Sequence, residues 1–185
     1  MRKISCSCVL ILLLAGTAIV KSAFAGNEKN LGLNVIVHTD FIVPVSSFKG
    51  LSKVGYGCSV TATQEVGWNL FTGVTVGFWA FNENGDTLQT LYMVPFLFTA
   101  GYTFRIVKGF YIQPQVSAGG NFVVLKQYAV TDKGVDSVLF KTGPSFGYML
   151  DINLLFTIDT EYGLIIEKKS QHHLVSISAG IGYRF

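Results

Sequence analysis

A polar stretch near the C-terminus holds the side chains that nucleophilic catalysis requires. His172 and His173 are adjacent, Ser170 and Ser176 flank them, and Glu167 precedes them. Serine, histidine and an acid are the residue types of a catalytic triad, in which the histidine takes the proton of the attacking hydroxyl. The two histidines could also hold a metal, but no third ligand lies at a fixed spacing from them. A polar loop with solvated histidines accounts for the same residues, and the sequence favours that interpretation.

Other charged residues lie within segments that alternate between apolar and polar positions. His38 and Asp40 are two residues apart, so an extended chain places them on one face, and Lys53 follows on the next such segment. Because an unpaired buried charge is strongly destabilising, we expect these groups to pair with one another and to be structural. The predicted polar network of the interior consists of His38, Asp40, Lys53, Lys141, Asp159 and Glu161.

The charged residues lie among eight segments that carry a bulky apolar residue at every second position. A period of two is that of a β-strand with one apolar face, as in the ending SISAGIGYRF. Lys, Arg, Asp and Glu are absent from all eight apolar series. Pro114 and Pro144 fall within two segments, and each predicts a bulge or a strand end. The predicted strands cover residues 31–41, 53–63, 70–80, 88–104, 110–122, 138–150, 154–164 and 174–185.

The distribution of charge distinguishes a membrane barrel from a soluble sheet protein. A soluble β-sandwich or lipocalin exposes a densely charged face. In this chain only 14% of the residues are charged and 50% are hydrophobic. An apolar exterior around a polar interior is typical of a transmembrane barrel, and hydrocarbon requires the sheet to close. The predicted fold is an all-β, eight-stranded antiparallel transmembrane up-and-down β-barrel. At that size, side chains largely fill the lumen.

The first 25 residues predict a signal peptide for export through the Sec pathway. Arg2 and Lys3 precede an apolar run, and small residues end at Ala25, where we expect cleavage. Residues 26–185 are expected to form a single barrel domain. The leader carries three of the 14 basic residues, which leaves 11 against 11 acidic residues, so charge does not favour a nucleic-acid partner. We expect Cys58 to be an apolar packing residue, and the sequence indicates no metal or cofactor.

The connections between the predicted strands alternate in length. Short ones lie near residues 66–69, 105–109 and 151–153, and longer ones cover residues 44–50, 82–87, 125–136 and 165–173. An even number of strands brings both termini to the side of the short turns. In bacterial outer-membrane barrels that side is periplasmic, so the longer loops are expected outside.

Three stretches resemble a known family. The ending GIGYRF, the stretch LYMVPFLFTAGYTF and the following FYIQPQVSAGGNF together resemble the small bacterial outer-membrane barrels of the OmpA, OmpX and OmpW kind. The resemblance is one of pattern, and only the ending is specific. It implies a location in the outer membrane, contact with its lipid, and periplasmic chaperones as partners in transit. It also implies that the barrel assembly machinery captures the last strand through Phe185, Tyr183, Ile181 and Ile177.

Three functions remain open for such a barrel. The favoured one is a structural or surface-exposed protein with interaction loops and no enzymatic activity. An OmpW-like porin or conduit for small or hydrophobic solutes would need a continuous lumen or a lateral opening, and the mixed inward residues favour a filled core. A lipid-modifying hydrolase is the third. Lipid A deacylase barrels carry a His-x-Ser pair at a strand end, whereas two residues separate His173 from Ser176 here.

Overall fold

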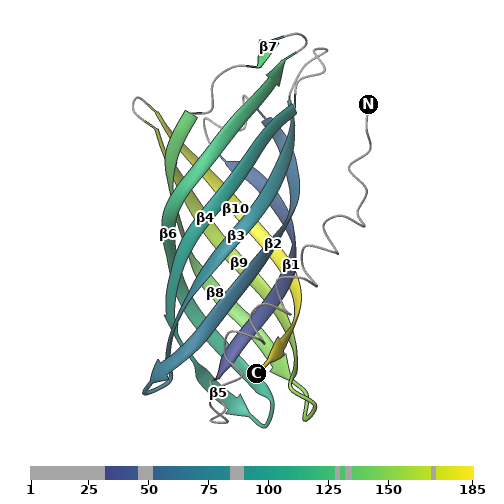
Figure 1. The fold of residues 1–185 in the computed structure, drawn as a ribbon, viewed down its shortest axis with the longest axis vertical. Helices are drawn as coiled ribbons and strands as arrows, with labels where there is room; N and C mark the ends of the chain where they lie inside the picture. The colour runs from purple at the N-terminus through teal and green to yellow at the C-terminus, as the bar shows by residue number, and fades with distance from the viewer. Residues whose placement is uncertain (1–31, 46–51, 84–89, 128–129, 132–134, 168–169) are drawn as a thin grey trace. The chain divides into compact units, whose positions relative to one another are not determined.

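The protein folds into one closed antiparallel β-barrel, shown in Figure 1. The computed structural model describes residues 32–45, 52–83, 90–127, 130–131, 135–167 and 170–185, so the predicted signal peptide lies outside the described residues. The strands are β1 (Leu33–Val45), β2 (Ser52–Gly67), β3 (Leu70–Glu83), β4 (Thr90–Tyr102), β5 (Phe104–Val107), β6 (Phe110–Gln127), β7 (Val130–Thr131), β8 (Val135–Met149), β9 (Leu154–Ile166) and β10 (Gln171–Arg184).

Eight of the ten strands form the full wall of the barrel, and the two short strands, β5 and β7, extend it. β5 continues β4 beyond Thr103 and pairs with the same neighbour, β6. β7 is a two-residue strand that pairs with the end of β6. The eight-stranded antiparallel barrel predicted from the alternation is therefore confirmed. Several strands run past the apolar series, because backbone pairing continues where the side chains become polar: β3 reaches Glu83 and β6 reaches Gln127.

The barrel closes between β1 and β10. Their pairing runs from Asn34 opposite Arg184 to Val45 opposite His173, and the Phe185 amide donates to the Leu33 carbonyl at 2.8 Å. Tight turns at 67–70, 107–110 and 150–154 share one end with the C-terminus, here called the turn end, and β7 lies at the opposite loop end (Figure 1). Among the described residues, no helix is long and apolar enough to cross a membrane.

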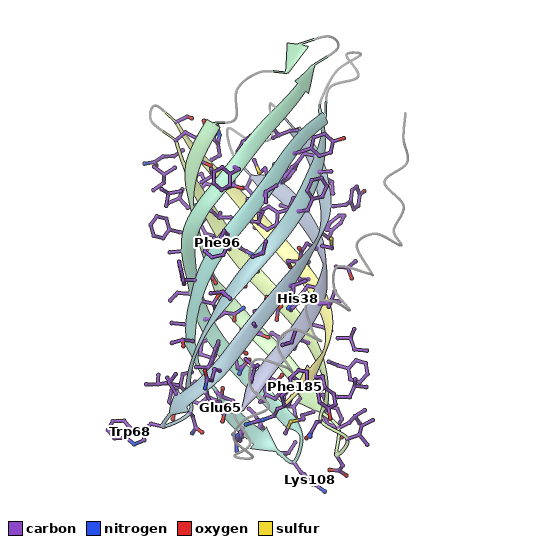
Figure 2. All side chains as sticks on the ribbon, viewed as in Figure 1. His38, Glu65, Trp68, Phe96, Lys108 and Phe185 are labelled. Atoms are coloured by element: carbon purple, nitrogen blue, oxygen red, sulfur yellow. The ribbon has the colours of Figure 1, made fainter. Side chains whose placement is uncertain are left out.

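The described side chains of the outward face carry no charge. Among strand residues whose side chains the structure describes, every outward position is free of Lys, Arg, Asp and Glu. Trp68, at the tip of a turn, projects away from the wall in Figure 2, and Phe96, on β4, is 41% exposed on the same face. Such a surface is expected of a wall that meets lipid rather than water.

Aromatic rings gather on the outward face near both ends. Toward the loop end, Phe41 lies against Tyr56 with ring centres 5.6 Å apart. Toward the turn end, Tyr183 contacts Phe185 with ring centres 5.0 Å apart. Two aromatic girdles separated by an apolar band mark the interfaces of outer-membrane barrels, because these rings favour the boundary between lipid and water.

The prediction that Pro114 and Pro144 mark bulges or strand ends is wrong. The two prolines lie opposite each other inside β6 and β8, and the pairing of β6 with β8 has the same register on both sides of them. A pair of opposite residues that exchanges no hydrogen bonds exists at every second position of an antiparallel ladder. Two prolines can face each other at such a position without losing a bond between their strands.

The uncharged exterior predicts a large penalty for one charge at mid-strand. Val76 faces outward in the middle of β3, opposite Val60 and Phe96, with 46% of its surface exposed. We expect Val76→Arg to lower the free energy of unfolding in lipid vesicles by about 2–4 kcal/mol, because the guanidinium would lie in hydrocarbon. The measurement is urea-induced unfolding of the vesicle-bound barrel.

The matched control is Val66→Arg. Val66 also faces outward but lies next to the turn that ends β2, where a charge reaches the interface and should cost about 0–1 kcal/mol. Equal unfolding free energies for the two variants would contradict the assigned membrane position.

Candidate functional site

The interior of the barrel is filled from two kinds of side chain. Toward the loop end, buried apolar residues form one cluster, here called the apolar plug: Ile42, Trp79, Phe81, Leu91, Met93, Leu97, Val123, Leu139, Ile165 and Leu174. Below it, Ser, Thr, Gln and charged side chains, together with Ile36, Phe71 and Leu97, line a cavity of about 40 Å³. That volume has room for about two water molecules. The lumen is therefore packed rather than open.

His38 and Asp159 meet across a strand. His38 lies on β1 and Asp159 on β9, with β10 between them, and the His38 Nδ1 atom is 3.1 Å from Asp159 Oδ2. Gly180 is the residue of β10 opposite His38, and a Cβ there would lie 2.7 Å from Nδ1. The distance suits an ion pair, although the two groups are not aligned for a hydrogen bond. His38 lies within the barrel in Figure 2.

Asp40 makes a contact of the same kind with Trp79. The indole Nε1–H donates to Asp40 Oδ2 at 2.9 Å, from β3 to β1 across β2. The residue of β2 opposite both is Gly57, and any side chain there would overlap the indole ring. The carboxylate is therefore stabilised by a hydrogen bond from a neutral ring.

Lys141 and Glu161 form an ion pair in the interior. Lys141 Nζ contacts Glu161 Oε2, and both side chains are more than nine-tenths buried. Gln115 on β6 also donates to Glu161, at 3.2 Å, and Lys141 Nζ lies 5.4 Å from the centre of the Trp79 ring. These contacts link the Lys141–Glu161 pair to the Asp40–Trp79 pair.

The structure places five of the six predicted network residues inside the polar half. It joins His38 with Asp159 and Lys141 with Glu161. The register sets Ser59 and Gly57 opposite His38 and Asp40, and the expected grouping of these two residues with Lys53 stays a prediction. The side chain of Lys53 lies outside the described part of the structure.

The four residues predicted as an assembly signal lie on or beside β10. Ile177, Ile181 and Tyr183 face outward and are about half exposed. Phe185 follows the strand and holds the seam through its amide, while its ring contacts Tyr183. In the closed barrel β10 is paired on both sides, with β1 and with β9.

The candidate triad residues do not form a triad. Ser170 Oγ donates to Glu167 Oε2 at 3.1 Å, and His172 Nε2 lies 3.9 Å from that same oxygen, so the acid rather than the histidine is in the middle. His173 faces outward and hydrogen-bonds the Tyr162 hydroxyl at 2.5 Å. Ser176 faces inward and is buried. His173 and Ser176 are thus on opposite faces of β10 and cannot act on one substrate.

A cluster at the turn end was missed by sequence reasoning. Glu65, at the end of β2, accepts from Arg105 of β5 at 3.1 Å and from Arg184 of β10 at 3.2 Å. The cluster borders a cavity of about 350 Å³, here called the turn-end vestibule, whose lining includes Asn34, Thr103, Tyr111 and Gln113. The sequence could have indicated this cluster. Each of the three charged residues is next to a predicted turn or at the end of the last predicted strand, and antiparallel topology brings those ends together.

Among the described side chains, no three His, Cys, Asp or Glu residues are arranged to hold a metal ion. Cys58 is a half-buried residue of the outward face of β2.

Comparison with known proteins gives likeness of fold. No protein-family model matches the chain, and no curated protein matches it. Among solved structures, Neisserial surface protein A is 16% identical with a TM-score of 0.64 over 83% of this chain and 97% of that one. Ail, the attachment invasion locus protein of Yersinia pestis, is 15% identical with a TM-score of 0.50 over 83% and 96%. The chain has the fold of the small outer-membrane β-barrels, as the resemblance implied.

The Lys141–Glu161 pair predicts an asymmetric response to mutation. Lys141→Met leaves the Glu161 carboxylate buried without its cation, and we expect the free energy of unfolding to fall by about 3–5 kcal/mol. Adding Glu161→Gln to that variant should restore most of the loss, because no buried charge then remains unpaired. Urea unfolding of the three proteins measures both effects, and a double variant as unstable as the single one would refute the pairing.

Proposed function

We propose that the protein is an integral outer-membrane barrel with a closed lumen, which acts through its structure and its exposed loop end and has no enzymatic activity. The observation that carries this proposal is the combination of an uncharged outward face with a lumen filled by the apolar plug. A wall of this kind is stable in lipid, and a packed core offers solutes no path. The two structural neighbours are named for surface exposure and for attachment and invasion, which supports a surface role.

The filled lumen argues against the porin or conduit alternative. The apolar plug includes side chains from β1, β3, β4, β6, β8, β9 and β10, and most of its members are less than 3% exposed. The cavity beneath it has room for only about two waters. Each of the eight wall strands pairs with a neighbour on both sides, which argues against a lateral opening among the described residues.

The hydrolase alternative has little support from geometry. A Ser-His pair must share a proton, and Ser176 and His173 are on opposite faces of the wall. Ser170 does lie near His172, but its hydroxyl donates to Glu167. The serine thus donates to the acid and not to a histidine, which is not the arrangement of a Ser-His-acid triad.

Export and insertion complete the proposal. Residues 1–25 direct the chain through the Sec pathway and are removed, and periplasmic chaperones carry residues 26–185 to the outer membrane. The barrel assembly machinery then captures the final strand by Phe185, Tyr183, Ile181 and Ile177. The outward position of the last three side chains supports this role, since they lie on the face that a lipid-embedded partner can reach.

The packed lumen predicts an electrically silent barrel. Protein extracted from membranes and inserted into planar lipid bilayers should show no stepwise conductance, whereas a general porin in the same bilayers does. Replacing Phe81 and Leu91 together by alanine removes apolar volume from the plug and should raise leakage above that of the unmodified protein. Discrete conductance steps from the unmodified barrel would overturn the closed-lumen proposal.

The assembly signal predicts a defect that appears only in cells. Deleting Phe185 should lower the amount of barrel in the outer membrane, while the deleted protein refolded in micelles keeps its heat-modifiable migration. Phe185→Tyr is the matched control, because it keeps an aromatic ring at the last position. Normal membrane levels of the deletion variant would remove the proposed role.

A further inference from the structure

The turn-end vestibule has the dimensions of a small-molecule site. Its volume is about 350 Å³, which lies at the lower end of the range for ligand pockets. Arg105, Lys108 and Glu65 lie at its rim, and Glu65 and Lys108 are labelled at this end in Figure 2. On its inner side it shares Gln113 with the small polar cavity, beyond which the apolar plug begins. A ligand can therefore enter only from the turn end.

The charges of the vestibule favour an anionic group. Arg105, Lys108 and Arg184 line it against one carboxylate, that of Glu65, and Lys108 also contacts Asp151 outside the lining at 3.5 Å. Each guanidinium uses only its Nη2 atom on Glu65, so the other N–H groups of both arginines remain for a ligand. Two arginines held by a shared carboxylate are also kept in place without a ligand. Their planar forks suit a carboxylate or a phosphate.

One buried hydrogen-bond acceptor in the vestibule has no donor. Asn34 is 9% exposed, its Nδ2 donates to Thr63 Oγ1 at 3.3 Å, and its Oδ1 has no hydrogen-bond partner. A buried polar atom without a partner is costly, and a ligand N–H would satisfy it. Because Asn34 Oδ1 and Glu65 are both acceptors, an anion without donors of its own, such as phosphate, fits poorly.

We propose that the turn-end vestibule binds the C-terminal end of a short peptide. The peptide carboxylate takes the spare N–H groups of Arg105 and Arg184, and the last peptide N–H donates to Asn34 Oδ1. No covalent step is involved. In the orientation proposed above, the vestibule faces the periplasm, and the peptide comes from there; binding itself does not depend on that orientation.

Nuclear magnetic resonance of the ¹⁵N-labelled barrel, extracted from membranes into micelles, tests the proposal. Alanyl-alanine should shift the Asn34 side-chain and Arg105 signals in a saturable way, with a dissociation constant on the order of 1 mM, as befits so small a ligand. Alanyl-alanine amide lacks the carboxylate, and acetate and inorganic phosphate lack the N–H. Each of these three should bind about tenfold more weakly, the ratio that the loss of one hydrogen bond can produce.

Two variants with opposite effects keep the test independent of stability. Arg105→Gln removes a largely exposed guanidinium and should weaken alanyl-alanine binding about tenfold. Glu65→Gln frees both guanidiniums from the Glu65 carboxylate and should strengthen the binding of alanyl-alanine. Glu167→Gln, the same change at the loop end, is the matched control and should leave that affinity unchanged. Equal affinity for alanyl-alanine and its amide or acetate, or an Arg105→Gln variant that binds normally, would overturn the proposal.

Discussion

In the hydrocarbon of a membrane, each backbone N–H and C=O group must find its partner within the protein. A sheet meets this condition only when its first and last strands pair, and here the β1–β10 seam joins twelve residue pairs in one register. The rest of the architecture depends on that closure. When every strand of the wall is paired on both sides, successive side chains point alternately to the lipid and to the lumen. A charged residue of a strand must then face inward.

Closure at eight strands leaves little space inside, and the side chains share it by interlocking. Asp40 reaches Trp79 across Gly57, and His38 reaches Asp159 across Gly180. In each case the intervening strand presents a glycine where any Cβ would collide with the crossing side chain. The inward glycines therefore decide which polar groups can meet, and they let polar side chains contact each other between strands that are not neighbours.

The sequence predicts the wall of this barrel better than its interior. Period-two alternation depends only on which face meets lipid, so the eight strands and the outward direction of residues such as Val76 could be read from residue types alone. Which inward groups meet depends on register, which closure and turn geometry set together. The partners of His38 and Asp40, which are Asp159 and Trp79, could therefore not be identified from the sequence. The prolines were misread because their effect depends on which position of the ladder they occupy. The Glu65 cluster was missed because three separate strand ends must be brought to one rim before it exists.

The seam also has a consequence for the time course of folding. It pairs Asn34 with Arg184, residues near opposite ends of the described chain, so it is the contact with the largest sequence separation and the greatest loop-closure entropy. The nearest-neighbour hairpins can form as soon as their residues are available, but β1 has no second partner until β10 arrives. Until then both keep open edges that can pair with other chains. The chain can thus be committed to its fold only after β10 has been delivered, and the interval before that is when it is most exposed to aggregation.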